Sequence, residues 1–213
     1  MKKLWLAVLL AAATLIFAAC GGAPQLSEVE TTVVDEEAVS FIRPAEWLPV
    51  EPVSEHGVCA FSAPDGSLSL EVVGELGAME YYSVEELGAE VAETVAAGLF
   101  AAETDSEQKT ADGRFTGIMR GEDGSGQKMV CRIDLFAPYP SVHYYLLALA
   151  TEDAYAESRG LLQGVADSFT VTKSDEEMYQ LIREEREAAA EQAGESGDAD
   201  DADNEGESEA PAD

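Results

Sequence analysis

Alternation of apolar and polar residues is the main pattern between residues 38 and 172. It is clear at residues 68–72, which predict a strand with one buried face. Residues 127–136 repeat it, with four apolar side chains on one face and Arg132 and Asp134 on the other. Short connections favour antiparallel pairing. Further strands are expected at residues 38–42, 58–62, 114–120, 142–150 and 168–172. Residues 142–150 are apolar nearly throughout, which fits a central strand covered on both sides.

Helical spacing interrupts this alternation twice. Ser83 with Glu86 forms a capping box, and apolar residues then recur at helical spacing up to Leu99. This stripe predicts a helix that packs on a core, closed by the acidic stretch at residues 103–107. Thr151 can cap a second helix that ends near Asp167.

Three short motifs resemble PsbP-like domains. They are Arg43-Pro44-Ala45-Glu46-Trp47 after the first strand, Phe61-Ser62-Ala63-Pro64-Asp65-Gly66 before the next, and Tyr144-Tyr145-Leu146 followed by a helix and Asp167-Ser168-Phe169. The resemblance implies an α+β fold, an antiparallel β-sheet sandwiched by helices, shared with photosystem II extrinsic proteins and DcrB-like bacterial lipoproteins. Members act mainly as binding or assembly accessories without a shared catalytic motif. Trp47 and Phe169 are expected to pack in the core.

The N-terminus has the layout of a lipoprotein signal peptide. Lys2 and Lys3 precede an apolar run at residues 4–19, which is too short, at about 24 Å as a helix, for a hydrocarbon core of about 30 Å. The residues before Cys20 resemble the bacterial lipobox, which predicts a diacylglycerol on Cys20 and anchoring at the extracytoplasmic face of the cell membrane. Gly21 in place of the inner-membrane retention Asp indicates the outer membrane if the host is Gram-negative. An uncleaved anchor and ordinary secretion are the alternatives.

Composition shifts divide the chain into five segments. Residues 1–20 are the signal, 21–37 a flexible acidic tether, 38–173 the PsbP-like domain, 174–193 an acidic helix capped by Ser174 and Glu177, and 194–213 a disordered acidic tail. The formal net charge is −31, from 43 acidic and 12 basic residues, and both the domain and the tail contribute to it. A surface this acidic repels nucleic acid, which we exclude as a partner.

The three cysteines suggest two alternatives for the domain. With Cys20 assigned to lipid, Cys59 and Cys131 remain as an even pair in a secreted protein. A disulfide between them would close a loop of about 72 residues and contribute roughly 4 kcal/mol. The alternative is two small buried residues at unrelated sites. Neither lies in a C-x-x-C motif or beside a histidine, so a redox or nucleophilic role has little support.

Motifs for catalysis are absent from the sequence. It contains two histidines and no metal-spaced Cys/His set, nucleophile elbow or phosphate-binding glycine loop. We therefore expect no enzymatic activity, no metal and no cofactor. His143, at a strand start, is expected to be a structural histidine with its hydrogen bonds satisfied. Residues 201–206 faintly resemble a calcium loop, but position twelve is Ala212 instead of Glu.

Aromatic residues in loops are the candidates for partner binding. Tyr139 stands between two prolines at a strand-connecting tip, and Tyr81 and Tyr82 precede the first helix. The sequence thus favours a lipid-anchored accessory protein that holds an envelope protein partner. A small-ligand-binding or hydrolytic lipoprotein and an envelope spacer without a specific ligand are the alternatives. An enclosed pocket with convergent polar groups would favour the former, and an exposed aromatic patch would favour the accessory role.

Overall fold

The computed structural model describes residues 23–36, 38–76, 82–100, 105–140, 142–181 and 183–184. The chain divides into two units, at residue 172. The predicted signal peptide, with Cys20, and the acidic residues after 184 lie outside the described residues. The elements of the first unit are η1 (Leu26–Glu28), β1 (Thr31–Glu36), β2 (Val39–Pro44), β3 (Leu48–Val50), β4 (Gly57–Ser62), β5 (Leu68–Leu76), α2 (Val84–Leu99), β6 (Asp105–Ala111), β7 (Arg114–Glu122), β8 (Lys128–Tyr139), β9 (Val142–Thr151), α3 (Glu152–Ser168) and β10 (Thr170–Val171).

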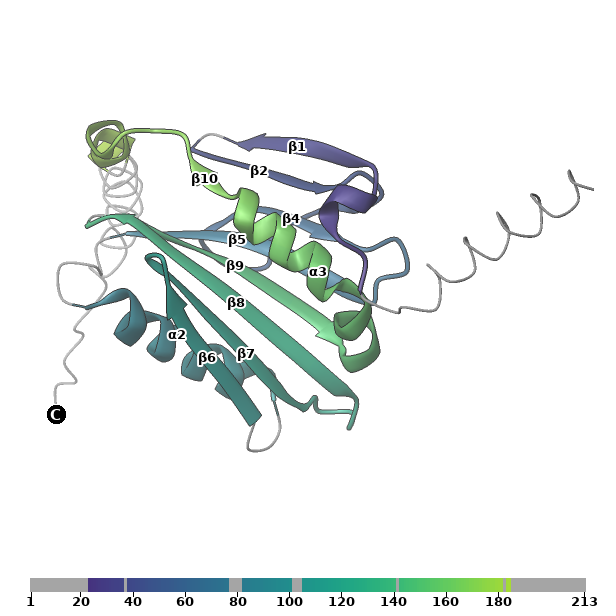
Figure 1. The fold of residues 1–213 in the computed structure, drawn as a ribbon. Helices are drawn as coiled ribbons and strands as arrows, with labels where there is room; N and C mark the ends of the chain where they lie inside the picture. Colours follow the sequence, from purple (N-terminus) through teal and green to yellow (C-terminus); the bar gives the residue numbers. More distant parts are fainter. Residues whose placement is uncertain are drawn as a thin grey trace, which may run out of the picture. The chain divides into compact units, whose positions relative to one another are not determined.

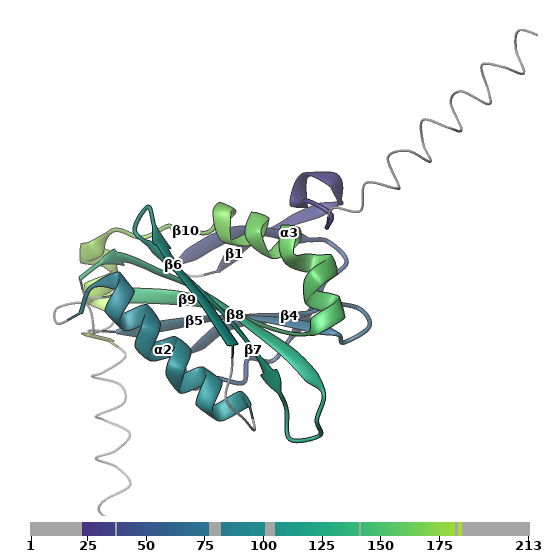
Figure 2. The same cartoon turned by 60° about the horizontal axis from the view of Figure 1, so that its bottom comes forward.

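Two antiparallel sheets form the first unit (Figure 1). The larger has seven strands in the order β3-β4-β5-β9-β8-β7-β6, and the smaller has three in the order β1-β2-β10. Helix α2 covers one face of the larger sheet, over β6, β7 and β8, while α3 and the smaller sheet lie over the other face (Figures 1 and 2). The fold is therefore α+β, an antiparallel sheet sandwiched by helices, as the sequence predicted.

The α2 face of the sheet carries the main apolar core. Helix α2 begins at the predicted capping box, in which the Ser83 hydroxyl accepts from the Glu86 amide and the Glu86 carboxylate accepts from the Ser83 amide. Its apolar stripe packs on the alternate side chains of β7, β8 and β9 that point toward it. Fully or nearly fully buried members of this core are Leu87, Ala92, Phe115, Met119, Cys131, Ile133, Leu135 and Tyr145.

Aromatic side chains join the smaller sheet to the opposite face. The Phe41 ring on β2 lies 6.1 Å, between ring centroids, from both Phe61 on β4 and Phe169 after α3. Phe169 also contacts Phe136, at 4.6 Å, and Tyr144, at 5.9 Å. Phe169 and Trp47 are buried, with 7% and 3% of their surface exposed. Both residues therefore pack in the core, as predicted.

Two segments differ from the sequence prediction. Residues 26–36, expected in the flexible tether, form η1 and then β1, which pairs with β2 over its whole length. The β-branched run from Thr31 to Val34 favours a strand, and Val34 is buried. The acidic stretch expected to end the first helix instead leads into β6. From residue 106 on β6 is exposed, so it has no apolar alternation that could have revealed it.

The second unit begins with the predicted capping box. The Ser174 amide and hydroxyl both donate to the Glu177 carboxylate, and residues 175–181 and 183–184 are helical. This confirms the start of the acidic helix. Among the helices in the described part of the chain, none is long and apolar enough to cross a membrane.

Candidate functional site

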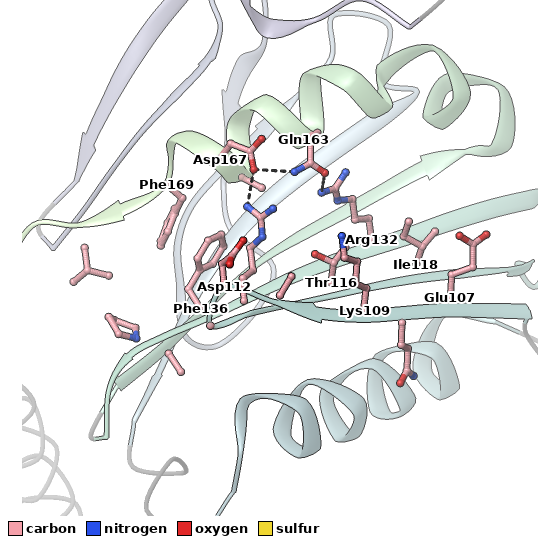
Figure 3. A pocket seen from close by; sticks show the side chains of 18 residues that line it. Glu107, Lys109, Asp112, Thr116, Ile118, Arg132, Phe136, Gln163, Asp167 and Phe169 are labelled. Atoms are coloured by element: carbon pink, nitrogen blue, oxygen red, sulfur yellow. Dashed lines mark hydrogen bonds and ion pairs between the residues drawn. The ribbon is translucent and has the colours of Figure 1, made fainter.

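A cleft of about 810 Å³ lies between α3 and strands β6, β7 and β8 (Figure 3). We call it the α3 cleft. Its walls come from residues of the three strands, from the turn between β6 and β7, and from the last turns of α3. Its charged and polar lining residues include Lys109, Asp112, Arg114, Arg132, Gln163 and Asp167.

A buried ion pair forms the floor of this cleft. Arg132 Nε donates to Asp134 Oδ2 at 2.7 Å, and Arg132 Nη2 donates to Asp134 Oδ1 at 3.0 Å. The two side chains are only 4% and 3% exposed. They lie two apart on β8, and residues at this spacing share one face of a strand. Thr116 on neighbouring β7 lies directly opposite Asp134, and its hydroxyl donates to Asp134 Oδ1 at 2.8 Å.

A second layer of hydrogen bonds ties this pair to α3. Arg132 Nη2 also donates to Gln163 Oε1 at 2.8 Å, and Gln163 Nε2 donates to Asp167 Oδ1 at 2.8 Å. Asp167 Oδ1 accepts in addition from Arg114 Nη1, at 2.9 Å. Gln163 and Asp167 are four apart on the helix, so both face the sheet. Figure 3 shows this chain of contacts crossing from the helix to the strands.

Burial and charge act against each other on the groups of this network. Desolvation lowers the pKa of Arg132, but the hydrogen bonds and negative charge of Asp134 outweigh it and raise the pKa above the ordinary value. Desolvation raises the pKa of Tyr155, which bonds to Arg132 from α3, and the positive charge of Arg132 only partly offsets this. Arg132 is therefore held in its charged form and Tyr155 as a neutral phenol.

The two ends of the cleft differ in chemistry. At one end Phe136 and Phe169 stack against each other, and the Arg114 guanidinium lies 5.7 Å from the centroid of the Phe136 ring. The other end is bounded by β6, where Glu107 accepts from Arg120 Nη1 at 2.7 Å and Lys109 is exposed. Arg114 keeps 23% of its side chain exposed and has N–H donors left for a ligand. The cleft can therefore receive a molecule with both an apolar and a polar or acidic part.

Cys59 and Cys131 are both buried free thiols, so the disulfide alternative is wrong. Cys59 lies on β4 beside Val72, while Cys131 lies on β8 in the α2 core. Strands β5 and β9 separate them, which corresponds to roughly 14 Å at about 4.8 Å per strand, and a disulfide needs Cα atoms within about 7 Å. Burial raises the pKa of each thiol to about 12.

Of the tyrosines proposed for partner binding, Tyr139 and Tyr82 do not line the α3 cleft. Tyr139 ends β8 and is half-buried, and Tyr82, which directly precedes the cap of α2, is 43% exposed. Tyr81 lies outside the described residues. Within the described ranges, three or more His, Cys, Asp or Glu side chains are nowhere grouped closely enough to hold a metal ion.

His143 is buried, but its hydrogen bonds are not satisfied as expected. Only 1% of its surface is exposed, and neither ring nitrogen has a hydrogen-bond partner in the described structure. Glu75 Oε2, opposite it on β5, lies 3.7 Å from Nε2, and the Tyr145 hydroxyl donates to the same carboxylate at 3.3 Å. Desolvation lowers the pKa of His143, and Glu75 opposes this only in part.

Sequence reasoning missed the residues of the α3 cleft. It placed Arg132 and Asp134 on the polar face of their strand without recognising that a helix covers them. One signal was available in the sequence. Five of the 12 basic residues of this acidic chain lie between positions 109 and 132.

The chain forms an α+β domain with a cleft beneath α3, and it was compared with known proteins. No family model matches the sequence, and no curated protein matches it. The solution structure of PsbP from the cyanobacterium Synechocystis aligns with a TM-score of 0.47 and 18% identity, over 71% of this chain and 96% of that one. That structure has the family name that the sequence motifs suggested.

Two further structures have comparable similarity. A Bacteroides thetaiotaomicron protein aligns with a TM-score of 0.44 and 9% identity, over 68% of this chain and 49% of its own. LpqN, involved in cell envelope biogenesis of Mycobacterium tuberculosis, aligns with a TM-score of 0.43 and 12% identity, over 72% of this chain and all of its own. Values in this range leave the function open.

Proposed function

We propose that this chain is a lipid-anchored accessory protein that acts at the extracytoplasmic face of a membrane and binds a partner in the α3 cleft. The signal sequence that ends at Cys20 supports the location. The cleft supports a binding role of either kind, because its volume of about 810 Å³ falls in the range of about 300–1,000 Å³ typical of small-molecule sites. A spacer without a ligand would not need such a site.

The hydrogen-bond network supports specific recognition. Arg132, Gln163 and Asp167 hold one another in place, so the cleft walls are arranged before a partner arrives and little side-chain entropy is lost on binding. Arg114 then presents donors beside the Phe136 ring. This pairing suits a polypeptide segment of a partner protein with an apolar side chain next to an acidic one.

We also propose that the site binds without catalysing a reaction. Two carboxylates that could act as bases are already engaged by arginines, Asp134 by Arg132 and Asp167 by Arg114. Oxygens of both carboxylates already accept hydrogen bonds from an arginine, which limits the contacts they can make with a substrate.

Site-specific photo-crosslinking in intact cells tests the proposal. A photo-reactive residue at Ala111, which is exposed and lines the cleft, is expected to capture one defined partner. The same residue at Glu93, exposed on α2, is the matched control and is expected to capture nothing above background. Capture at Ala111 should disappear on Arg114→Ala. Equal capture at both positions, or capture that survives Arg114→Ala, would contradict the proposal.

A small amphiphilic carboxylate is the second candidate for the same cleft. The observation that favours it is the contact between Arg114 and Phe136, which places a cation beside an apolar ring. Native mass spectrometry of protein purified from its membrane separates the two cases. A bound mass below about 1 kDa that is lost with Arg114→Ala supports the small molecule, whereas a cross-linked protein supports the accessory role.

A further inference from the structure

β6 is an open edge of the seven-stranded sheet. It stands last in the strand order, and its pairing with β7 runs without a bulge from Asp105 opposite Arg120 to Ala111 opposite Arg114. No strand of the described part pairs with its outer side. Alternate residues of this seven-residue strand therefore turn unpaired backbone donors and acceptors outward, which makes this edge a template for another strand. Figures 1 and 2 show β6 at this margin of the sheet.

The opposite edge of the sheet does not offer the same template. β3 has only three residues, and the central one is Pro49, which has no N–H to donate. The connection between β6 and β7 is a tight hairpin, in which Asp112 and Gly113 have φ of 53° and 75°. This turn keeps β6 paired with β7 up to its last residue.

The charges on β6 are arranged symmetrically about Gln108. Glu107 precedes this residue and Lys109 follows it, and both side chains line the α3 cleft, so they share one face. If a second β6 pairs antiparallel with Gln108 opposite itself, Glu107 faces the partner's Lys109, and the partner's Glu107 faces Lys109. Cross-strand pairs of opposite charge stabilise antiparallel sheets, and two like charges would repel. The strand is thus complementary to itself.

We propose that β6 pairs with β6 of a second copy of this chain around a two-fold axis at Gln108. The dimer joins two seven-stranded sheets into one continuous sheet, with both α3 clefts on the same face. An interface of this kind is isologous, because both copies use the same surface. Each contact between two residues therefore occurs twice, once in each direction. The clefts then meet at the axis, and the partner's Lys109 approaches the Glu107–Arg120 ion pair.

Local charge makes this edge a favourable place for two acidic molecules to meet. The whole chain has a net charge of −31, but residues 105–136 contain five basic and six acidic residues. Repulsion between exposed charges farther away is screened beyond about 8 Å at physiological ionic strength. This proposal is independent of the ligand of the cleft, so either proposal can fail alone.

Cysteine cross-linking of the full-length chain in membranes tests the register. Gln108→Cys places two thiols opposite each other, whereas Thr110→Cys, equally exposed on the same strand, places them about 13 Å apart along the strands. Cys59 and Cys131 are buried, and the parent chain measures any background from Cys20. We expect a cross-linked dimer from Gln108→Cys and none above background from Thr110→Cys. Equal yields from the two variants, or no dimer from either, would overturn the proposal.

Charge reversal then tests the complementarity in the Gln108→Cys background. Lys109→Glu puts like charges opposite each other twice, and we expect about tenfold less dimer. Adding Glu107→Lys to this variant exchanges the two charges and restores complementarity, so most of the cross-linking should return. A doubly exchanged variant that cross-links no better than Lys109→Glu would overturn the proposed register.

Discussion

The guanidinium of Arg132 donates to both carboxylate oxygens of Asp134, at 2.7 and 3.0 Å, and both side chains are buried on the same face of β8. Two-point contact fixes the orientation of the guanidinium plane. Arg132 can then reach Gln163 on α3, so the pair connects the sheet to the helix above it. The arrangement of the α3 cleft floor depends on this ion pair and on its hydrogen bond to Gln163.

Removal of Asp134 should strongly destabilise the domain. Asp134→Ala leaves Arg132 charged and buried without its partner, and the free energy of unfolding should fall by about 3–5 kcal/mol. Urea unfolding followed by tryptophan fluorescence measures this. The matched control is Glu152→Ala, which removes the exposed partner of Lys128 at 3.8 Å and should cost less than about 1 kcal/mol. An equal effect of the two substitutions would contradict the structural role of the buried pair.

Stability should fall on mild acidification because of His143. Its pKa is lowered in the folded protein, so between that value and about 6.5 the unfolded chain binds more protons than the folded one. The free energy of unfolding therefore decreases as the pH drops through this window, by at most about 1.4 kcal/mol per pH unit. Glu75 and Tyr145 are left unchanged when the parent chain is compared with a His143 variant.

Unfolding titrations between pH 7.5 and 5 measure the contribution of His143. His143→Leu removes the titrating group and should flatten the curve relative to the parent chain. His56→Gln, which changes the exposed histidine, is the control. A parent curve that matches that of His143→Leu would show that the buried imidazole does not contribute.

Two glycines of α2 should respond to alanine with opposite signs. A Cβ on Gly88 would lie 2.2 Å from Cγ of Phe115, so Gly88→Ala should destabilise by about 1–3 kcal/mol through overpacking. A Cβ on Gly98 meets nothing within 4 Å, and Gly98→Ala should stabilise by up to about 1 kcal/mol through helix propensity. Thermal unfolding of the two variants and the parent chain measures the sign of each stability change. The same sign for both would mean that α2 does not pack on Phe115 as described.

The two domain thiols should be present but unreactive in the folded protein. Burial raises the pKa of Cys59 and of Cys131 to about 12, so neither forms an appreciable amount of thiolate at neutral pH. A thiol reagent should label neither in native buffer and both in urea without reductant. If the unfolded, unreduced chain showed no free thiol at these positions, the separation of β4 and β8 would be wrong.

Local patterns in the sequence were sufficient for most elements of the fold. The Ser83–Glu86 box and the Thr151 cap mark where α2 and α3 begin, because capping depends on residues within one turn. Alternation identified β5 and β8, because the side chains on one face of each strand are apolar and those on the other are mostly polar. It could not identify β1 or β6, whose residues are mostly exposed and whose strand geometry comes from pairing with a neighbour.

The sequence by itself indicated most of the strands and both helices of the domain, identified the residues that cap those helices, and showed that the chain is acidic. Only the tertiary structure decided that α3 covers Arg132 and Asp134, that two intervening strands separate Cys59 from Cys131, and that β6 is an open edge. The physical reason is range. Propensity and periodicity act over a few neighbouring residues, whereas a buried ion pair, a thiol separation and a sheet edge arise from segments far apart in the chain.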